Sequence, residues 1–127
     1  CGAENYFCLW QGWNGDDLVA TIDLGVLDTV HSVTVHALSD HMSWIFPAES
    51  VTVTGSSDGK QYRELGRFDF PEARSKSTHG IIPYDVKFSK PERCRFLKIQ
   101  VKNIGKIPDW RGVDGMAWLF VDEIIVN

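Results

Sequence analysis

The chain has 127 residues, a length typical of a single domain that encloses one hydrophobic core. Its 13 basic and 17 acidic residues give a net charge of −4, and the Lys and Arg residues are scattered singly, so no basic stripe exists to bind a nucleic-acid backbone. The longest uninterrupted apolar run, MAWLFV at 116–121, is far shorter than the ~20 residues that a membrane-spanning helix needs.

The first residue is Cys1 instead of a methionine, which indicates either a fragment of a longer protein, as we expect, or a mature lipoprotein whose first cysteine carries lipid. The three cysteines, Cys1, Cys8 and Cys94, lack the C-x-x-C pairs of metal fingers, so no zinc site is expected. Because the count is odd, at least one thiol is free. Cys94 heads an apolar strand and suits a small buried position, although a disulfide from Cys94 to Cys1 or Cys8 stays open.

Residues 1–17 mix aromatic rings with Gly, Asn and Asp, which is typical of a loop. We expect the Trp10 ring to pack at the end of the hydrophobic core. Trp13, flanked by Gly12 and Gly15, suits a core position and a ligand-binding position equally well.

Alternating apolar and polar residues predict the strands that follow, because successive side chains of a strand point to opposite faces. LVATIDL and VHSVTVHA alternate in this way on either side of a turn at Gly25–Asp28. In the clearest local pattern, Asp58-Gly59 supplies the left-handed turn of a hairpin. Pro83 predicts an edge strand. The seven predicted strands are 18–24, 30–37, 51–55, 61–66, 81–88, 94–101 and 117–126.

Two of the connections between these strands are long and irregular. Residues 67–79 are polar, contain Pro71 and predict a surface loop. Residues 38–50 contain Pro47 and no helical stripe, and three adjacent apolar residues at 44–46 form either an exposed spike or, as we expect, a cap on the core.

The end of the chain places a loop directly before a buried strand. Residues 117–126 are apolar at nearly every position except Asp122 and Glu123, which predicts a central strand covered on both faces, with Trp118 in the core. In the preceding loop, Trp110 lies between a stiff proline and a permissive glycine, and we expect its ring to be held out for stacking.

These strands, without a convincing helix, predict an all-β fold, an antiparallel jelly-roll β-sandwich. Several segments resemble the discoidin domains, also called coagulation factor V/VIII type C domains. Within that superfamily the chain is most similar to the C-terminal module of bacterial β-N-acetylhexosaminidases of glycoside hydrolase family 20, a module related to the family 32 carbohydrate-binding modules. The segments that carry the resemblance are WQGWNGDDLVATIDLG (10–25), SSDGKQY (56–62), CRFLKIQVKNIGKIPDW (94–110) and AWLFVDEIIV (117–126).

The resemblance implies a galactose-binding-domain-like sandwich of eight strands with ligand-holding loops at one end. It also implies a bacterial protein that is secreted, periplasmic or on the cell surface, with the catalytic domain of a glycoside hydrolase elsewhere in the parent chain. A structural calcium ion near the first loop and the last strand is implied as well, and Glu123 matches the family's carboxylate ligand. The family's upstream Asp-Gly turn, which helps to hold this calcium, is missing from the start of the chain.

The sequence offers no arrangement for catalysis. A nucleophile with its base and a phosphate-binding glycine loop are both missing. Asp122 and Glu123 are neighbours on one strand, so they face opposite sides and cannot act on one glycosidic bond together.

The loops do contain the residue types that bind sugars, namely aromatic rings that stack on C–H faces and polar groups that bond hydroxyls. We predict a shallow pocket for a galactose-type or N-acetylhexosamine-type glycan, lined by Trp13, Asp40, His41, Trp110 and Arg111. The alternative is a structural domain that buttresses the catalytic domain and binds no glycan. Membrane binding through residues 44–46 is disfavoured by the acidic balance and by the lack of flanking Lys and Arg.

Overall fold

The computed structural model describes residues 6–15, 17–75, 78–108, 110, 112 and 115–127, and for residues 6–14, 41, 122 and 123 it describes the backbone alone. Within these residues the strands form one six-stranded sheet in the order β1-β6-β2-β5-β3-β4, with every neighbouring pair antiparallel. The elements are β1 (Tyr6–Asn14), β2 (Leu18–Ser39), the 3-10 helix η1 (His41–Ser43), β3 (Ser50–Ser56), β4 (Arg63–Asp69), the 3-10 helix η2 (Pro71–Arg74), β5 (Gly80–Lys102) and β6 (Trp118–Val126).

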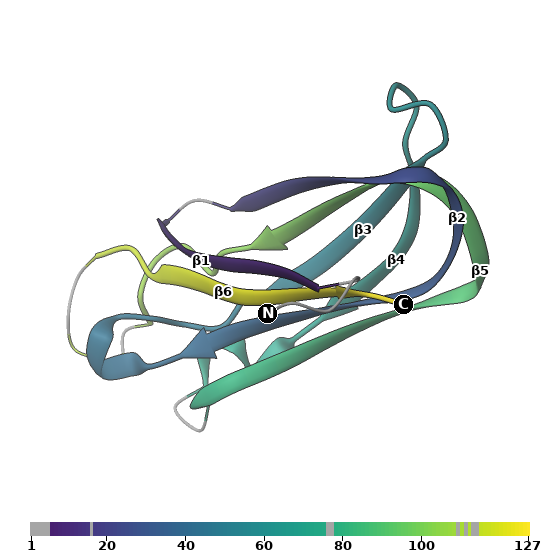
Figure 1. Ribbon diagram of the computed structural model, residues 1–127. Helices are drawn as coiled ribbons and strands as arrows, with labels where there is room; N and C mark the ends of the chain where they lie inside the picture. The colour runs from purple at the N-terminus through teal and green to yellow at the C-terminus, as the bar shows by residue number, and fades with distance from the viewer. Residues whose placement is uncertain (1–5, 16, 76–77, 109, 111, 113–114) are drawn as a thin grey trace.

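The sheet curls into two layers because β2 and β5 are long and bend together (Figure 1). The register of their pairing shifts between Asp23 and Asp28 and again between Val30 and Ser32, and these irregularities mark the bend. One layer, the β6 layer, contains β1, β6, the second half of β2 and the first half of β5. The other, the β3 layer, contains the first half of β2, the second half of β5, β3 and β4. The predicted antiparallel jelly-roll sandwich is therefore confirmed.

Each predicted strand overlaps a strand of the structure, but two pairs are joined. The segments predicted at 18–24 and 30–37 are the two halves of β2, since the chain turns the corner between layers without losing its partner. The same holds for 81–88 and 94–101 in β5. Pro83 lies in the first half of β5. Among the described strands, this half pairs with β2 alone, so it forms an edge of the sheet, as predicted.

The prediction of a loop over residues 1–17 is wrong for Tyr6–Asn14, which form β1 along β6. The Gly and Asn residues of this segment favour a turn, which is why its composition predicted a loop. Without β1, however, β6 would present an open row of backbone donors and acceptors, and pairing with β6 outweighs the local turn preference. β6 lies between β1 and β2, so the prediction of a central strand is confirmed. Its outer face is not fully covered, however, because Trp118 is exposed there.

The β3–β4 hairpin matches its prediction. Gly59 adopts the left-handed conformation, with φ of 78°. Backbone N–H groups of Lys60 and Gln61 donate to Asp58 Oδ1 at 2.8 and 3.1 Å, and these bonds lower the pKa of the Asp58 carboxyl.

The core between the layers is continuous and apolar. Cys94 lies in it with a free, fully buried thiol, as predicted, and burial raises the pKa of that thiol. A smaller cluster closes the end of the sandwich that carries the loops, and it contains Phe46, Ala73, Ile104, Ile107 and Ala117. The main core includes Val33, Val35, Val51, Val53, Tyr84, Val86, Leu97, Ile99, Val101, Leu119, Val121 and Ile124.

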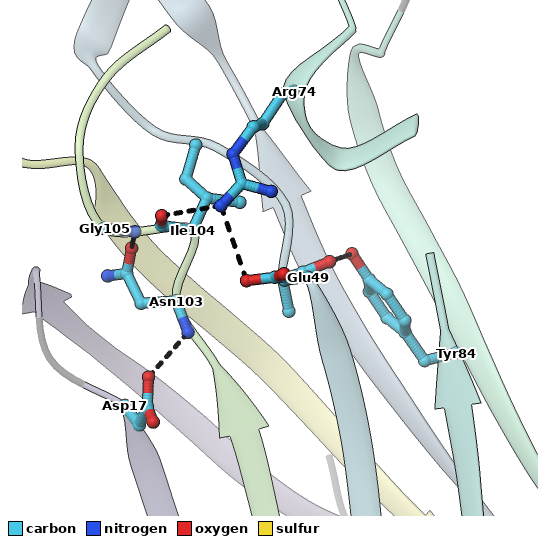
Figure 2. Close-up of polar contacts among 8 residues, drawn as sticks. Asp17, Glu49, Arg74, Tyr84, Asn103, Ile104 and Gly105 are labelled. Atoms are coloured by element: carbon cyan, nitrogen blue, oxygen red, sulfur yellow. Dashed lines mark hydrogen bonds and ion pairs between the residues drawn. The ribbon is translucent and has the colours of Figure 1, made fainter. Parts of the chain in front are cut away.

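Tyr84 joins this core to the loop between η1 and β3. Its ring is fully buried and meets the rings of Phe68 and Phe70 edge-on, with centroids 5.7 and 5.6 Å away. Its hydroxyl donates a hydrogen bond of 2.8 Å to the Ala48 carbonyl (Figure 2), and burial raises the pKa of Tyr84 well above its ordinary value.

Replacing Tyr84 by Phe leaves the buried Ala48 carbonyl unpaired. We expect Tyr84→Phe to lower the free energy of unfolding by about 1–2 kcal/mol in urea denaturation. Tyr62→Phe, at the β3–β4 hairpin, is the matched control and should change it by less than about 0.5 kcal/mol. A Tyr84→Phe variant as stable as the wild type would show that this hydrogen bond does not hold the loop.

Candidate functional site

Three connections meet at one end of the sandwich, opposite the β3–β4 hairpin (Figure 1). They are the β1–β2 turn, the segment 40–49 and the segment 103–117. Backbone hydrogen bonds join them: Gly15 N–H donates to the Ala117 carbonyl at 2.8 Å, and Trp118 N–H donates to the Trp44 carbonyl at 2.9 Å. Loops far apart in the sequence thus lie side by side, as the sequence predicts.

Arg74 of η2 fastens two neighbouring loops (Figure 2). Its Nη2 donates to the Ile104 carbonyl at 3.0 Å and lies 3.5 Å from Glu49 Oε2. Its own carbonyl accepts the indole N–H of Trp110 at 2.7 Å. The position of Trp110 is therefore fixed by a backbone group of η2.

Asn103 organises the turn that follows β5, and it is nearly fully buried. Its Oδ1 accepts from Gly105 N–H at 2.8 Å, and its Nδ2 donates to the Ala117 carbonyl at 3.1 Å. Its backbone N–H donates to Asp17 Oδ1 at 2.9 Å (Figure 2), which ties the β1–β2 turn to the same loop.

Trp110 is half-buried, and its ring meets Phe46 edge-on with centroids 6.0 Å apart. The expectation that its ring is held clear of the core is wrong in this respect, because the small cluster under the loops leaves an apolar edge that the indole covers. The rest of the ring stays accessible.

Truncating Trp110 should therefore destabilise the fold. Trp110→Ala removes the contact with Phe46 and the bond to Arg74, and we expect it to lower the free energy of unfolding by about 1–3 kcal/mol in urea denaturation. Trp44→Ala, in the same loop cluster, should cost less than about 1 kcal/mol. Equal stability of the Trp110→Ala variant and the wild type would contradict the packing role.

Asp40 is exposed and closes a tight loop with Ile45, through backbone bonds of 2.9 Å in both directions. Its Oδ2 accepts from the Ser43 hydroxyl at 3.0 Å, so the carboxylate is oriented yet open to solvent. His41 follows in η1, next to Asp40 at the loop end, and its side chain lies outside the described residues.

The other predicted site residues are placed only in part. Trp13 lies in β1 opposite Leu119, and Glu123 lies in β6 between Cys8 and His36, but the side chains of both lie outside the described residues. Arg111 lies wholly outside them. Within the described part of the chain, no group of three His, Cys, Asp or Glu side chains is placed to hold a metal ion, and no helix is long and apolar enough to cross a membrane.

A set of exposed apolar side chains at the same end was not predicted. We name it the loop-end platform; it consists of Met42, Trp44, Met116 and Trp118, which are 82, 40, 44 and 38% exposed. The loops that carry it are joined by the bond between Trp44 and Trp118, and by Phe46 N–H donating to the Trp118 carbonyl at 3.0 Å. A side chain added at Gly115 would lie 3.9 Å from Trp44 Cζ3, so the Trp44 ring lies over the segment that holds Met116.

The prediction of Trp118 as a core residue is wrong. Leu119 and Val121 point inward, and alternation along β6 puts Trp118 and Phe120 on the outer face, with ring centroids 6.1 Å apart. The expected cap at 44–46 is right for Ile45 and Phe46 only. The alternation of inward and outward side chains along β6, followed from Leu119 back to Trp118, was the signal that could have placed Trp118 on the outer face.

Trp44 is also the one described non-glycine residue with a positive φ, at 62°. A bulky side chain in this conformation is costly, and such strain concentrates at binding sites. The tight Asp40–Ile45 loop imposes it and turns the ring outward.

Several solved structures have a similar fold. No protein-family model matches the chain, and no curated protein sequence matches it. A family 32 carbohydrate-binding module of AlyQ, in complex with 4,5-unsaturated mannuronic acid, superposes with a TM-score of 0.57 at 17% identity, over 91% of this chain and 74% of that one. The fold is the jelly roll of the family 32 carbohydrate-binding modules.

Two further structures share this jelly roll. A family 32 module from Clostridium perfringens, in complex with GalNAc-β-1,3-galactose, gives a TM-score of 0.52 at 16% identity, over 95% of this chain and 78% of that one. The C-terminal domain of a chitobiase from Bacteroides fragilis gives 0.51 at 21% identity, over 87% of this chain, which spans 62% of that domain.

Proposed function

We propose that this jelly roll is a glycan-binding module without catalysis of its own, which directs a bacterial glycoside hydrolase to its substrate. The observation that carries the proposal is the exposure of Trp44 and Trp118 on joined loops at the end of the sandwich. Indole faces stack on the C–H face of a pyranose, and the exposed Asp40 carboxylate nearby accepts bonds from hydroxyls.

We propose that the pocket predicted from the sequence is part of the same site. Trp110 and Asp40 lie in the loops at this end of the sandwich, and Trp13, His41 and Arg111 are its further proposed members. Modules of similar fold were solved with GalNAc-β-1,3-galactose and with an unsaturated mannuronic acid, which supports a sugar as the ligand class. We propose a galactose-type or N-acetylhexosamine-type glycan, bound by a protein that is secreted, periplasmic or on the cell surface.

Removing a platform ring should weaken glycan binding while leaving the fold intact. We expect Trp44→Ala and Trp118→Ala each to weaken retention of galactose-type or N-acetylhexosamine-type glycans by about tenfold or more, because a stacked ring is lost in each. Binding is measured first on a glycan array and then by calorimetry with the best ligand found.

Tyr62→Ala removes a ring at the opposite end and should bind like the wild type. A wild-type chain that is retained by no glycan, or a Trp44→Ala variant that binds normally, would overturn the proposal. In that case the platform would instead dock on the catalytic domain of the parent chain, for which the high exposure of Met42 is the observation in favour.

Calcium at Glu123 also remains a proposal. Oxygen ligands from an acidic strand residue suit calcium, and an ion bound only by the folded chain raises its melting temperature. Added calcium should therefore raise the melting temperature, and a chelator should lower it. If neither changes it, or if Glu123→Gln responds to calcium as the wild type does, Glu123 is not a calcium ligand.

A further inference from the structure

A second surface with binding chemistry lies on the outer face of the β3 layer and extends to Asp17 of the β1–β2 turn. It is a groove of about 270 Å³ lined by Asp17, Ser50, Thr52, Arg67, Gln100 and Lys102, which we name the sheet groove. It shares no residue with the platform. We propose that the sheet groove binds a carboxylate-bearing sugar, within an acidic oligosaccharide.

The strand register explains why these side chains gather. Thr52 of β3 lies opposite both Arg67 of β4 and Gln100 of β5, so the three form one row across the layer. Ser50 and Lys102 form the row two residues along, on the same face. The alternate residues on these strands point into the core, which leaves the outer face to hydrogen-bonding groups.

The charges in the groove favour an anion. Arg67 Nε donates to Asp69 Oδ1 at 2.9 Å, which orients the guanidinium and leaves its terminal N–H groups for another acceptor. Lys102 is exposed and forms no ion pair with a described residue. Among the described residues of the lining, the one carboxylate is that of Asp17, and it already accepts the Asn103 N–H at one oxygen.

Ser50 supplies an independent observation. Its side chain is only 3% exposed although it lines the groove, and no described residue forms a hydrogen bond with its hydroxyl. Buried hydroxyls in folded proteins almost always have a partner. A ligand oxygen in the groove would provide one.

These groups together define the ligand class. The described residues that line the groove include no aromatic or large aliphatic side chain, so they offer neither stacking nor lipid burial. A guanidinium fork matches a carboxylate in geometry, while the ammonium, amide and hydroxyls match further sugar oxygens. Arg67 and Lys102 stand two strand spacings apart and two residues apart along the strands, about 12 Å in all, so the ligand extends beyond a single carboxylate.

The test titrates the chain with a galacturonic acid trisaccharide and, separately, with its neutral galactose counterpart, by calorimetry. We expect the acidic trisaccharide to bind and added salt to weaken it, because the attraction is electrostatic. Lys102→Gln alone, and Arg67→Gln with Lys102→Gln, should weaken binding by about tenfold or more. Thermal melts verify that the variants remain folded.

Lys87→Gln with Arg93→Gln changes the net charge equally at positions outside the groove and should leave the affinity within about twofold. Trp44→Ala should also leave it unchanged, so failure of this site and failure of the platform are distinguishable. The proposal is overturned if the wild type ignores the acidic trisaccharide, if it binds the neutral one equally well, or if the control variant loses as much affinity as the groove variant.

Discussion

The pairing of β2 with β5 around a shared bend is the constraint on which the rest of the structure depends. Each strand contributes to both layers, so one ladder of backbone hydrogen bonds joins the two layers around the bend. At the bend, Arg95 forms a two-pronged bond to the Asp23 carboxylate, at 2.8 and 3.0 Å, and this bond lowers the pKa of Asp23. With the bend at one end, the connections 40–49 and 103–117 must meet at the other.

At that opposite end, some side chains pack the loops together and others are exposed on the surface. Arg74 and Asn103 use buried or half-buried hydrogen bonds to fix the loops, and Trp110 covers the small cluster under them. Trp44 and Trp118 are held on the same frame but turned outward. A rigid frame lowers the entropic cost of binding, which favours the sugar site that we propose because a shallow site makes few contacts.

Much of the fold could be predicted from the sequence, because alternation reports which face of a strand is buried. The hairpin at Asp58-Gly59 and the buried Cys94 followed from local chemistry. β1 could not be predicted, since its partner β6 is more than a hundred residues away and its own composition favours a loop. The joining of predicted strands into β2 and β5 could not be predicted either. A bulge that keeps the strand pairing and a turn that breaks the pairing contain the same residues.

The candidate site was predicted at the level of loops more than of side chains. The sequence identified segments that the structure brings together at one end of the sandwich, but Trp110 and Trp118 differ in their exposure from what their neighbours suggested. A tryptophan ring fills a gap or faces solvent according to what lies beneath it, here Phe46 for Trp110 and the outer face of β6 for Trp118. The sheet groove depends on cross-strand register, which local patterns do not reveal.

The central claim is that a glycan binds on the rings of the loop-end platform, and the most direct measurement is the indole N–H spectrum of the chain during a glycan titration. The chain has five tryptophans, and single Trp→Phe variants assign their signals. The account predicts that the Trp44 and Trp118 signals shift in a saturable manner on addition of a galactose-type or N-acetylhexosamine-type oligosaccharide. Unmoved Trp44 and Trp118 signals at saturating glycan would contradict it.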